Sequence, residues 1–103
     1  MKTTRLIIGD RLWSELYAHE YEVVRDQPSS ALEEPDRGEL AEAIHAATPT
    51  PKGWLMVLTP AAVDYLRRDA IGGWIGDWEE QGEDELYQQA RVVLRRLRRA
   101  TDR

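Results

Sequence analysis

Two kinds of apolar periodicity alternate along this chain of 103 residues, and each kind predicts its own type of element. Residues 3–8 are rich in β-branched side chains and predict a strand. Residues 54–58 are almost continuously apolar and predict a second strand with both faces covered. Apolar residues spaced three or four positions apart predict helices over 11–26, 36–47, 60–80 and 83–100. The predicted order is β-α-α-β-α-α, an α+β fold with two short strands and four helices.

Capping signals mark three of the predicted helix starts. Asp10 precedes the first helix and Thr59 precedes the third, and we expect both side chains to accept hydrogen bonds from the free amides of the first turn. Pro60 follows Thr59 at the first helical position, where proline is favoured. Asp36 and Glu39 have the spacing of a capping box and predict the start of the second helix.

Polar, proline-rich and glycine-rich segments interrupt the apolar pattern. Residues 28–35 are expected to form a polar loop, and residues 48–53 a stiff connector. The apolar phase continues through the glycines of the third helix, so one long helix is expected over 60–80, with or without a kink. Gly72 and Gly76 share one face of that helix and would allow another backbone to approach closely.

Composition limits the classes of protein and of site. The length fits a single domain over residues 1–103. The absence of cysteine excludes disulfides, thiolate zinc sites and cysteine nucleophiles. The longest apolar run is too short to span a membrane, and the first ten residues do not form a signal peptide. A cytoplasmic protein is expected.

The histidines offer weak metal-ligand spacings. Glu15 and His19 are four residues apart, and Glu42 and His45 are three apart, so each pair lies on one helix face. A di-iron bundle needs two Glu-x-x-His motifs and two further carboxylates. Neither a metal site nor a cofactor is therefore predicted.

Charge is unevenly distributed along the chain. The 14 basic and 19 acidic residues give a net charge of −5, which argues against a dedicated nucleic-acid binder. Residues 86–103 nevertheless hold six arginines against one aspartate. Such a segment either complements the dipole of the last helix or binds phosphate or an acidic partner. Four of the arginines share one face of this helix and are called the arginine ridge: Arg91, Arg95, Arg98 and Arg99.

Trp74 and Trp78 are four residues apart beside Gly72 and Gly76, and this segment allows three interpretations. Exposed tryptophans are typical of hot spots in protein interfaces, so both are candidate partner-binding residues. The alternatives are packing within the chain and a simple break of the helix.

One charged residue falls within the apolar stripe of each of two helices. Glu20 lies between Leu16 and Trp13 on a helical wheel, and Arg67 lies between Val63 and Trp78. Because an unpaired buried charge is costly, we expect the Glu20 carboxylate to meet Arg67 or another arginine at the edge of the core.

The first part of the chain resembles a ribbon-helix-helix module. The resemblance is carried by Thr4-Arg-Leu-Ile-Ile-Gly-Asp-Arg-Leu-Trp-Ser-Glu-Leu16 and by Asp36-Arg-Gly-Glu-Leu-Ala-Glu-Ala-Ile44. It implies a dimer whose paired strands enter the major groove of DNA. The long loop over 27–35 and the five basic against ten acidic residues over 1–47 depart from that family.

The whole chain is also similar in style to small uncharacterised proteins of high-GC actinobacteria and their phages. The similarity is carried by the Thr59-Pro60 helix start, the Gly-Trp segment and the arginine-rich last helix. It implies an accessory role in a phage or mobile element, and it supplies no catalytic residues.

The sequence therefore predicts a small acidic protein that binds or regulates a protein partner, acts as a homodimer and is not an enzyme. The residues offer no phosphate loop, nucleophile elbow or zinc-helix motif. The alternative is a ribbon-helix-helix-like transcriptional regulator that binds DNA.

Overall fold

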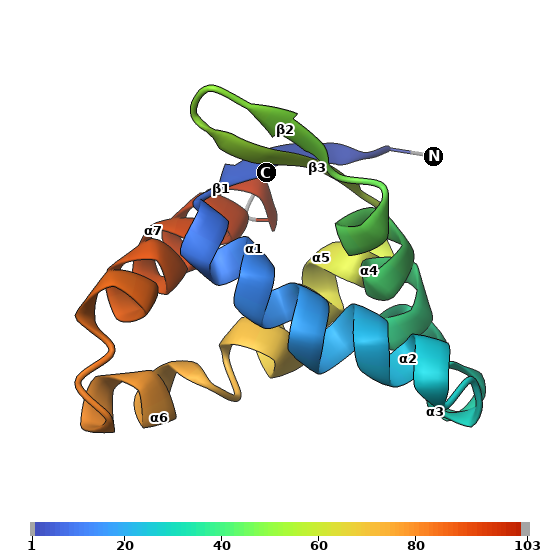
Figure 1. The fold of residues 1–103 in the computed structure, drawn as a ribbon. Helices are drawn as coiled ribbons and strands as arrows, with labels where there is room; N and C mark the ends of the chain where they lie inside the picture. The colour runs from blue at the N-terminus through green and yellow to red at the C-terminus, as the bar shows by residue number, and fades with distance from the viewer. Residues whose placement is uncertain (1, 102–103) are drawn as a thin grey trace.

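The computed structural model describes residues 2–101, which form an antiparallel sheet with helices on one side of it (Figure 1). The α+β class is confirmed, although the sheet has a third strand. Its strands are β1 (Thr4–Ile8), β2 (Thr48–Thr50) and β3 (Gly53–Leu58), in the order β1-β3-β2. The helical elements are α1 (Asp10–Leu16), η1 (Tyr17–Tyr21), α2 (Glu22–Asp26), α3 (Ser29–Glu33), α4 (Pro35–His45), α5 (Pro60–Tyr65), η2 (Leu66–Ile71), α6 (Ile75–Glu80) and α7 (Asp84–Thr101).

The first predicted strand and helix are confirmed. The helix contains a π-helical segment, η1, which a helical wheel of constant period does not predict. The predicted cap is wrong, because Gly9 is the N-cap. Asp10 instead accepts a hydrogen bond from Trp54 Nε1 at 2.9 Å. The amide of Leu12 donates to Gln89 Oε1 at 3.0 Å, so α7 supplies the missing cap.

The second helix begins earlier than predicted. The expected loop over 28–35 contains the short helix α3, and Glu34 is the N-cap of α4. Pro35 occupies the first position of α4, where its missing amide removes no hydrogen bond. Asp36 lies within the first turn, so the predicted capping box with Glu39 is wrong.

The expected connector over 48–53 is a hairpin, and β2 is its first strand. Thr50 pairs with Gly53 across the turn, and Thr50 Oγ1 donates to the Gly53 carbonyl at 2.7 Å. Pro49 is tolerated because β2 is an edge strand. Gly53 has a φ of 135°, and a Cβ there would lie 2.2 Å from the Ile8 carbonyl oxygen, so glycine is required.

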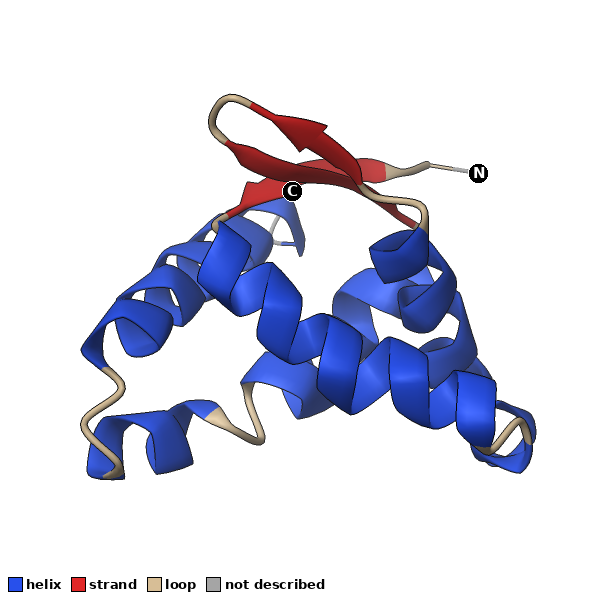
Figure 2. Cartoon of the chain, viewed as in Figure 1, coloured by secondary structure: helices blue, strands red, loops and turns tan. Residues whose placement is uncertain are grey.

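The expectation that both faces of 54–58 are covered is wrong. Met56 and Leu58 are buried against the helices, whereas Val57 points to the other face and has 51% of its surface exposed. Figure 2 shows that the helices lie on a single side of the sheet. Side chains alternate between the faces of a strand, so an apolar run does not by itself place cover on both.

The long helix expected over 60–80 is broken. α5 continues into the π-helical segment η2, and a turn over Gly72–Trp74 then separates η2 from α6. The predicted approach of another backbone to Gly72 and Gly76 is also wrong. A Cβ on Gly72 would meet the carbonyl oxygen of Arg67 in its own helix at 2.4 Å, and a Cβ on Gly76 would meet nothing within 4 Å.

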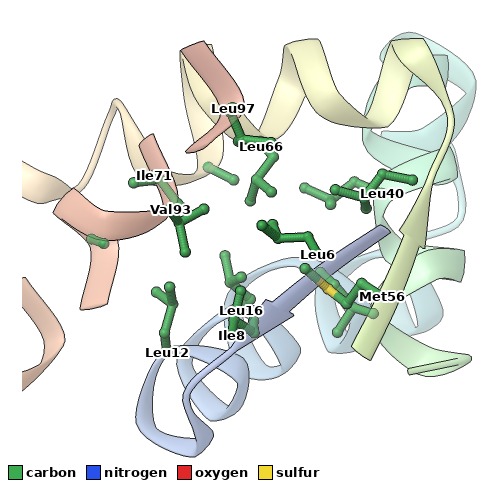
Figure 3. Close-up of a cluster of buried hydrophobic side chains, with 14 of the residues drawn as sticks. Leu6, Ile8, Leu12, Leu16, Leu40, Met56, Leu66, Ile71, Val93 and Leu97 are labelled. Atoms are coloured by element: carbon green, nitrogen blue, oxygen red, sulfur yellow. The ribbon is translucent and has the colours of Figure 1, made fainter. Parts of the chain in front are cut away.

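The core lies between the sheet and the helices. Leu6 and Ile8 of β1 contribute to it with Met56 of β3 (Figure 3). The helices contribute Leu12, Leu16, Leu40, Leu66, Ile71, Val93 and Leu97, among others. Trp13 of α1 stacks on Trp54 of β3, with ring centroids 3.7 Å apart and planes at 7°. No helix within residues 2–101 is long and apolar enough to cross a membrane.

The two glycines beside the break are expected to respond oppositely to alanine. Gly76→Ala should raise the free energy of unfolding by up to about 1 kcal/mol, since helix propensity improves without a contact. Gly72→Ala should lower it by about 1–3 kcal/mol, because the Cβ collides with carbonyl oxygens of η2. Urea denaturation followed by circular dichroism measures both values. Equal effects of the two substitutions would contradict this explanation.

Candidate functional site

Three of the four arginines of the ridge border a groove between α6 and α7, whereas Arg99 is exposed outside its lining. Arg91, Arg95 and Arg98 line this groove, which has a volume of about 380 Å³. The opposite wall is formed by α6, and the groove is also lined by apolar and polar residues: Ile75, Gly76, Glu79, Tyr87 and Leu94. The helical face predicted from sequence is thus exposed and borders a concave surface, which we call the α6–α7 groove.

Within the groove, Tyr87 links the two helices. Its hydroxyl is hydrogen-bonded to Glu79 of α6, and this bond, followed by partial burial, raises the pKa of Tyr87. The Arg91 guanidinium lies 5.7 Å from the centroid of the Tyr87 ring, within the range of a cation–π interaction. Glu79 is therefore occupied by Tyr87 rather than by an arginine.

Ion pairing distinguishes the arginines of α7 from those of the other helices. Within residues 2–101, neither Arg91, Arg95 nor Arg99 forms an ion pair with a carboxylate. Every arginine of the preceding helices does form one: Arg11 with Glu15 and Glu83, Arg25 with Asp26, Arg37 with Glu20, and Arg67 and Arg68 with Asp64. The positive charge on α7 is accordingly less compensated than elsewhere.

Trp78 does not belong to an exposed surface. Only 4% of it is accessible, and it packs in the core, so the expectation that it is an exposed contact residue is wrong. The break at Gly72–Trp74 turns α6 so that Trp78 points inward. Trp74 is 39% exposed, and its ring stacks on His19 with centroids 5.0 Å apart. Trp74 stays a candidate contact residue outside the α6–α7 groove.

Glu20 is buried and ion-paired as predicted, but its partner is Arg37 rather than Arg67. Arg37 Nε donates to Glu20 Oε2 at 2.8 Å, and Arg37 Nη2 donates to the His19 carbonyl at 3.0 Å. Arg67 is exposed and pairs with Asp64 at 3.5 Å. Arg67 was predicted to lie in the apolar stripe because Trp78 was assigned to the same continuous helix. Without that residue the stripe is centred on Ala62 and Leu66.

The electrostatics of Glu20 follow from its burial. Desolvation raises the pKa of Glu20, and the nearby Arg37 opposes this rise. Tyr65 lies in the same region, where burial and then the Glu20 charge raise the pKa of its hydroxyl. Arg37 uses its guanidinium on Glu20 and His19, so this cluster is a structural ion pair rather than an open site.

The two predicted carboxylate–histidine pairs have different surroundings. His19 Nε2 lies 3.0 Å from Glu15 Oε2, and the same carboxylate accepts from Arg11 at 2.6 Å. His45 instead stacks on Tyr21, with centroids 4.3 Å apart. Within residues 2–101, no group of three or more His, Asp or Glu residues could hold a metal ion.

Sequence reasoning missed a second hollow, of about 610 Å³, beside α2, α3 and α4. Tyr21, Val24 and Arg25 line it together with His45 and Gly38 of α4, among others. The stack of Tyr21 on His45 forms part of its wall. No sequence signal brings Tyr21 and His45 together, because the path of the chain over residues 27–34 determines how close they lie.

Comparison with known proteins gives no match to a family model, a curated protein or a solved structure. A function for the chain must therefore be inferred from the geometry of its own residues.

The Glu20–Arg37 pair gives a prediction for stability. Arg37→Met should lower the free energy of unfolding by about 3 kcal/mol at pH 7, because it leaves a buried carboxylate without its partner. Without Arg37 the pKa of Glu20 rises further, so the folded variant holds a proton that the unfolded chain releases. The loss relative to the native chain should therefore shrink toward pH 5 and grow as the pH rises through that raised pKa.

Urea denaturation at several pH values measures this loss. The double variant Glu20→Leu/Arg37→Met is the control and should recover part of the stability, since it removes both charges. A loss below about 0.5 kcal/mol at pH 7, or a loss independent of pH, would contradict a supporting role for the pair.

Proposed function

We propose that this chain is a non-enzymatic binding protein that holds an acidic segment of a protein partner in the α6–α7 groove. The observation that carries the proposal is the contrast in pairing: arginines of the earlier helices have carboxylate partners, whereas Arg91 and Arg95 have none within residues 2–101. An acidic partner would supply the missing carboxylates, and bidentate arginine contacts would orient it.

The floor of the groove supports a protein partner rather than a small anion. Ile75 and Leu94 offer apolar surface beside the arginines, and Tyr87 provides an aromatic contact. Interfaces commonly place apolar and aromatic contacts at the centre, with charge around them. A partner segment with an apolar residue flanked by carboxylates fits this arrangement.

A non-enzymatic role is consistent with the state of the buried acid. Among residues 2–101, Glu20 is the buried charged side chain, and Arg37 occupies its carboxylate. A general base needs an available carboxylate near a substrate, and Glu20 lies outside the hollows described above. The similarity to phage and mobile-element accessory proteins stays a prediction and agrees with a binding role.

The proposal is tested by charge reversal in the groove. Affinity capture with mass spectrometry, from cells that naturally make the chain, should enrich an acidic protein. The variant Arg91→Glu/Arg95→Glu should reduce that enrichment at least about tenfold, because two attractive contacts become repulsive. Arg25→Glu is the control for charge reversal on another helix, since Arg25 lies on α2 and does not line the groove.

The native chain and the Arg91→Glu/Arg95→Glu variant also test the alternative that the chain binds DNA. Fluorescence anisotropy with a 24-base-pair duplex measures binding directly, and binding through arginines would weaken steeply with salt. Two results together would overturn the proposal in favour of DNA. The native chain would bind the duplex at micromolar concentration and Arg91→Glu/Arg95→Glu would not, and no protein captured from cells would depend on Arg91 and Arg95.

Self-association is a further part of the proposal. The outer face of the sheet exposes Val57 beside the half-buried Ile7 and Leu55, and a second copy of the chain would cover it. Light scattering should then give about twice the chain mass of 11.9 kDa at micromolar concentration. Val57→Lys should shift the mass toward that of one chain. A single-chain mass for the native protein would contradict the homodimer.

A further inference from the structure

The outer edge of β1 is an open strand edge. β1 pairs with β3 along one side, and within residues 2–101 no other backbone group bonds to it. Arg96 Nη1 donates to the Ile7 carbonyl at 3.3 Å from the other side. Backbone groups alternate in direction along an antiparallel strand, so the amide and carbonyl of Arg5 point outward with those of Ile7.

A second groove lies between this edge and α7, on the opposite flank of α7 from the α6–α7 groove. Its volume is about 500 Å³, which is within the range of ligand pockets. Val92 and Val93 of α7 give it an apolar side, and 43% of Val92 is exposed. Arg96 and Lys52 provide its charge, and no acidic side chain lines it. We call it the β1–α7 groove.

We propose that the β1–α7 groove binds an extended acidic peptide segment, which adds to the sheet as a strand beside β1. The backbone of the segment would bond to the open groups of Arg5 and Ile7. Alternate side chains would rest on Val92, and carboxylates would meet Arg96 and Lys52. Arg96 would exchange its bond to the Ile7 carbonyl for a stronger ion pair with the segment.

Charge favours such a segment over a second copy of this chain at the same edge. A two-fold axis beside Ile7, to whose carbonyl Arg96 donates, would bring the Arg96 side chains of both copies together. Like charges brought together across an interface are repulsive. A copy that covers the outer face of the sheet would leave the edge of β1 free.

The two grooves can be tested separately, because adjacent residues of α7 line its two opposite flanks. Arg95 lines the α6–α7 groove and Arg96 lines the β1–α7 groove. Reversing each charge separately therefore assigns a bound peptide to one flank or to the other.

The first test measures affinity with a defined probe. Fluorescence anisotropy of the labelled peptide Thr-Glu-Val-Glu-Val-Glu-Thr is titrated with the full chain. Arg96→Glu should raise the Kd at least about tenfold, whereas the control Arg25→Glu should change it less than about threefold. A peptide methylated at every backbone nitrogen should not bind, because it cannot pair with a strand. No binding of the unmethylated peptide at 1 mM, or loss in Arg95→Glu but not in Arg96→Glu, would overturn the proposal.

The second test measures protection of the backbone amides at the outer edge of β1 in the native chain. Amide hydrogen exchange followed by NMR should slow about tenfold or more at Arg5 and Ile7 when the peptide is added. The amides of Thr4 and Leu6 face β3 and should change much less. Peptide binding without protection at Arg5 and Ile7 would overturn strand addition. Protection that depends on protein concentration, without peptide, would show that a second copy occupies the edge.

Discussion

The buried carboxylate of Glu20 imposes the strictest condition on this fold. Leaving water costs the charged group several kcal/mol, and only a partner at hydrogen-bond distance offsets that cost. Arg37 meets this condition at 2.8 Å, and through its second bond to the His19 carbonyl it fixes α4 against η1. α4 packs in turn on α5 and on β3. The ion pair therefore helps to fix α4 relative to η1, α5 and β3.

The glycine turn after η2 has an equally wide effect on the surface. It ends the α5–η2 helix at Ile71 and sets α6 beside α7 instead of continuing past it. This change of direction buries Trp78 and creates the second wall of the α6–α7 groove. A continuous helix would have left the arginine ridge on a convex surface. The α6–α7 groove is thus a product of a local loss of helix propensity.

Elements with a strong local signal could be predicted from the sequence, whereas those set by distant contacts could not. β1, β3 and α7 follow from their apolar periodicity, and the burial of Glu20 follows from its position between Leu16 and Trp13. The error on Arg67 arose because a wheel with a fixed period was carried through a π-helical segment and a break. β2 was missed because three residues with a central proline carry almost no strand signal. The exposed face of the arginine ridge was predictable, but the walls of both grooves depend on tertiary packing.

The separation of charge along the chain also has a consequence for the speed of encounter. Six arginines lie in residues 86–103, while the rest of the chain is acidic, so the molecule has an electric dipole directed along this asymmetry. Such a dipole orients an approaching charged molecule before contact and raises the association rate. The effect fades once the distance exceeds the Debye length, which is about 8 Å at physiological ionic strength. Added salt would therefore slow the encounter while leaving the apolar contacts, and hence the dissociation rate, much less affected.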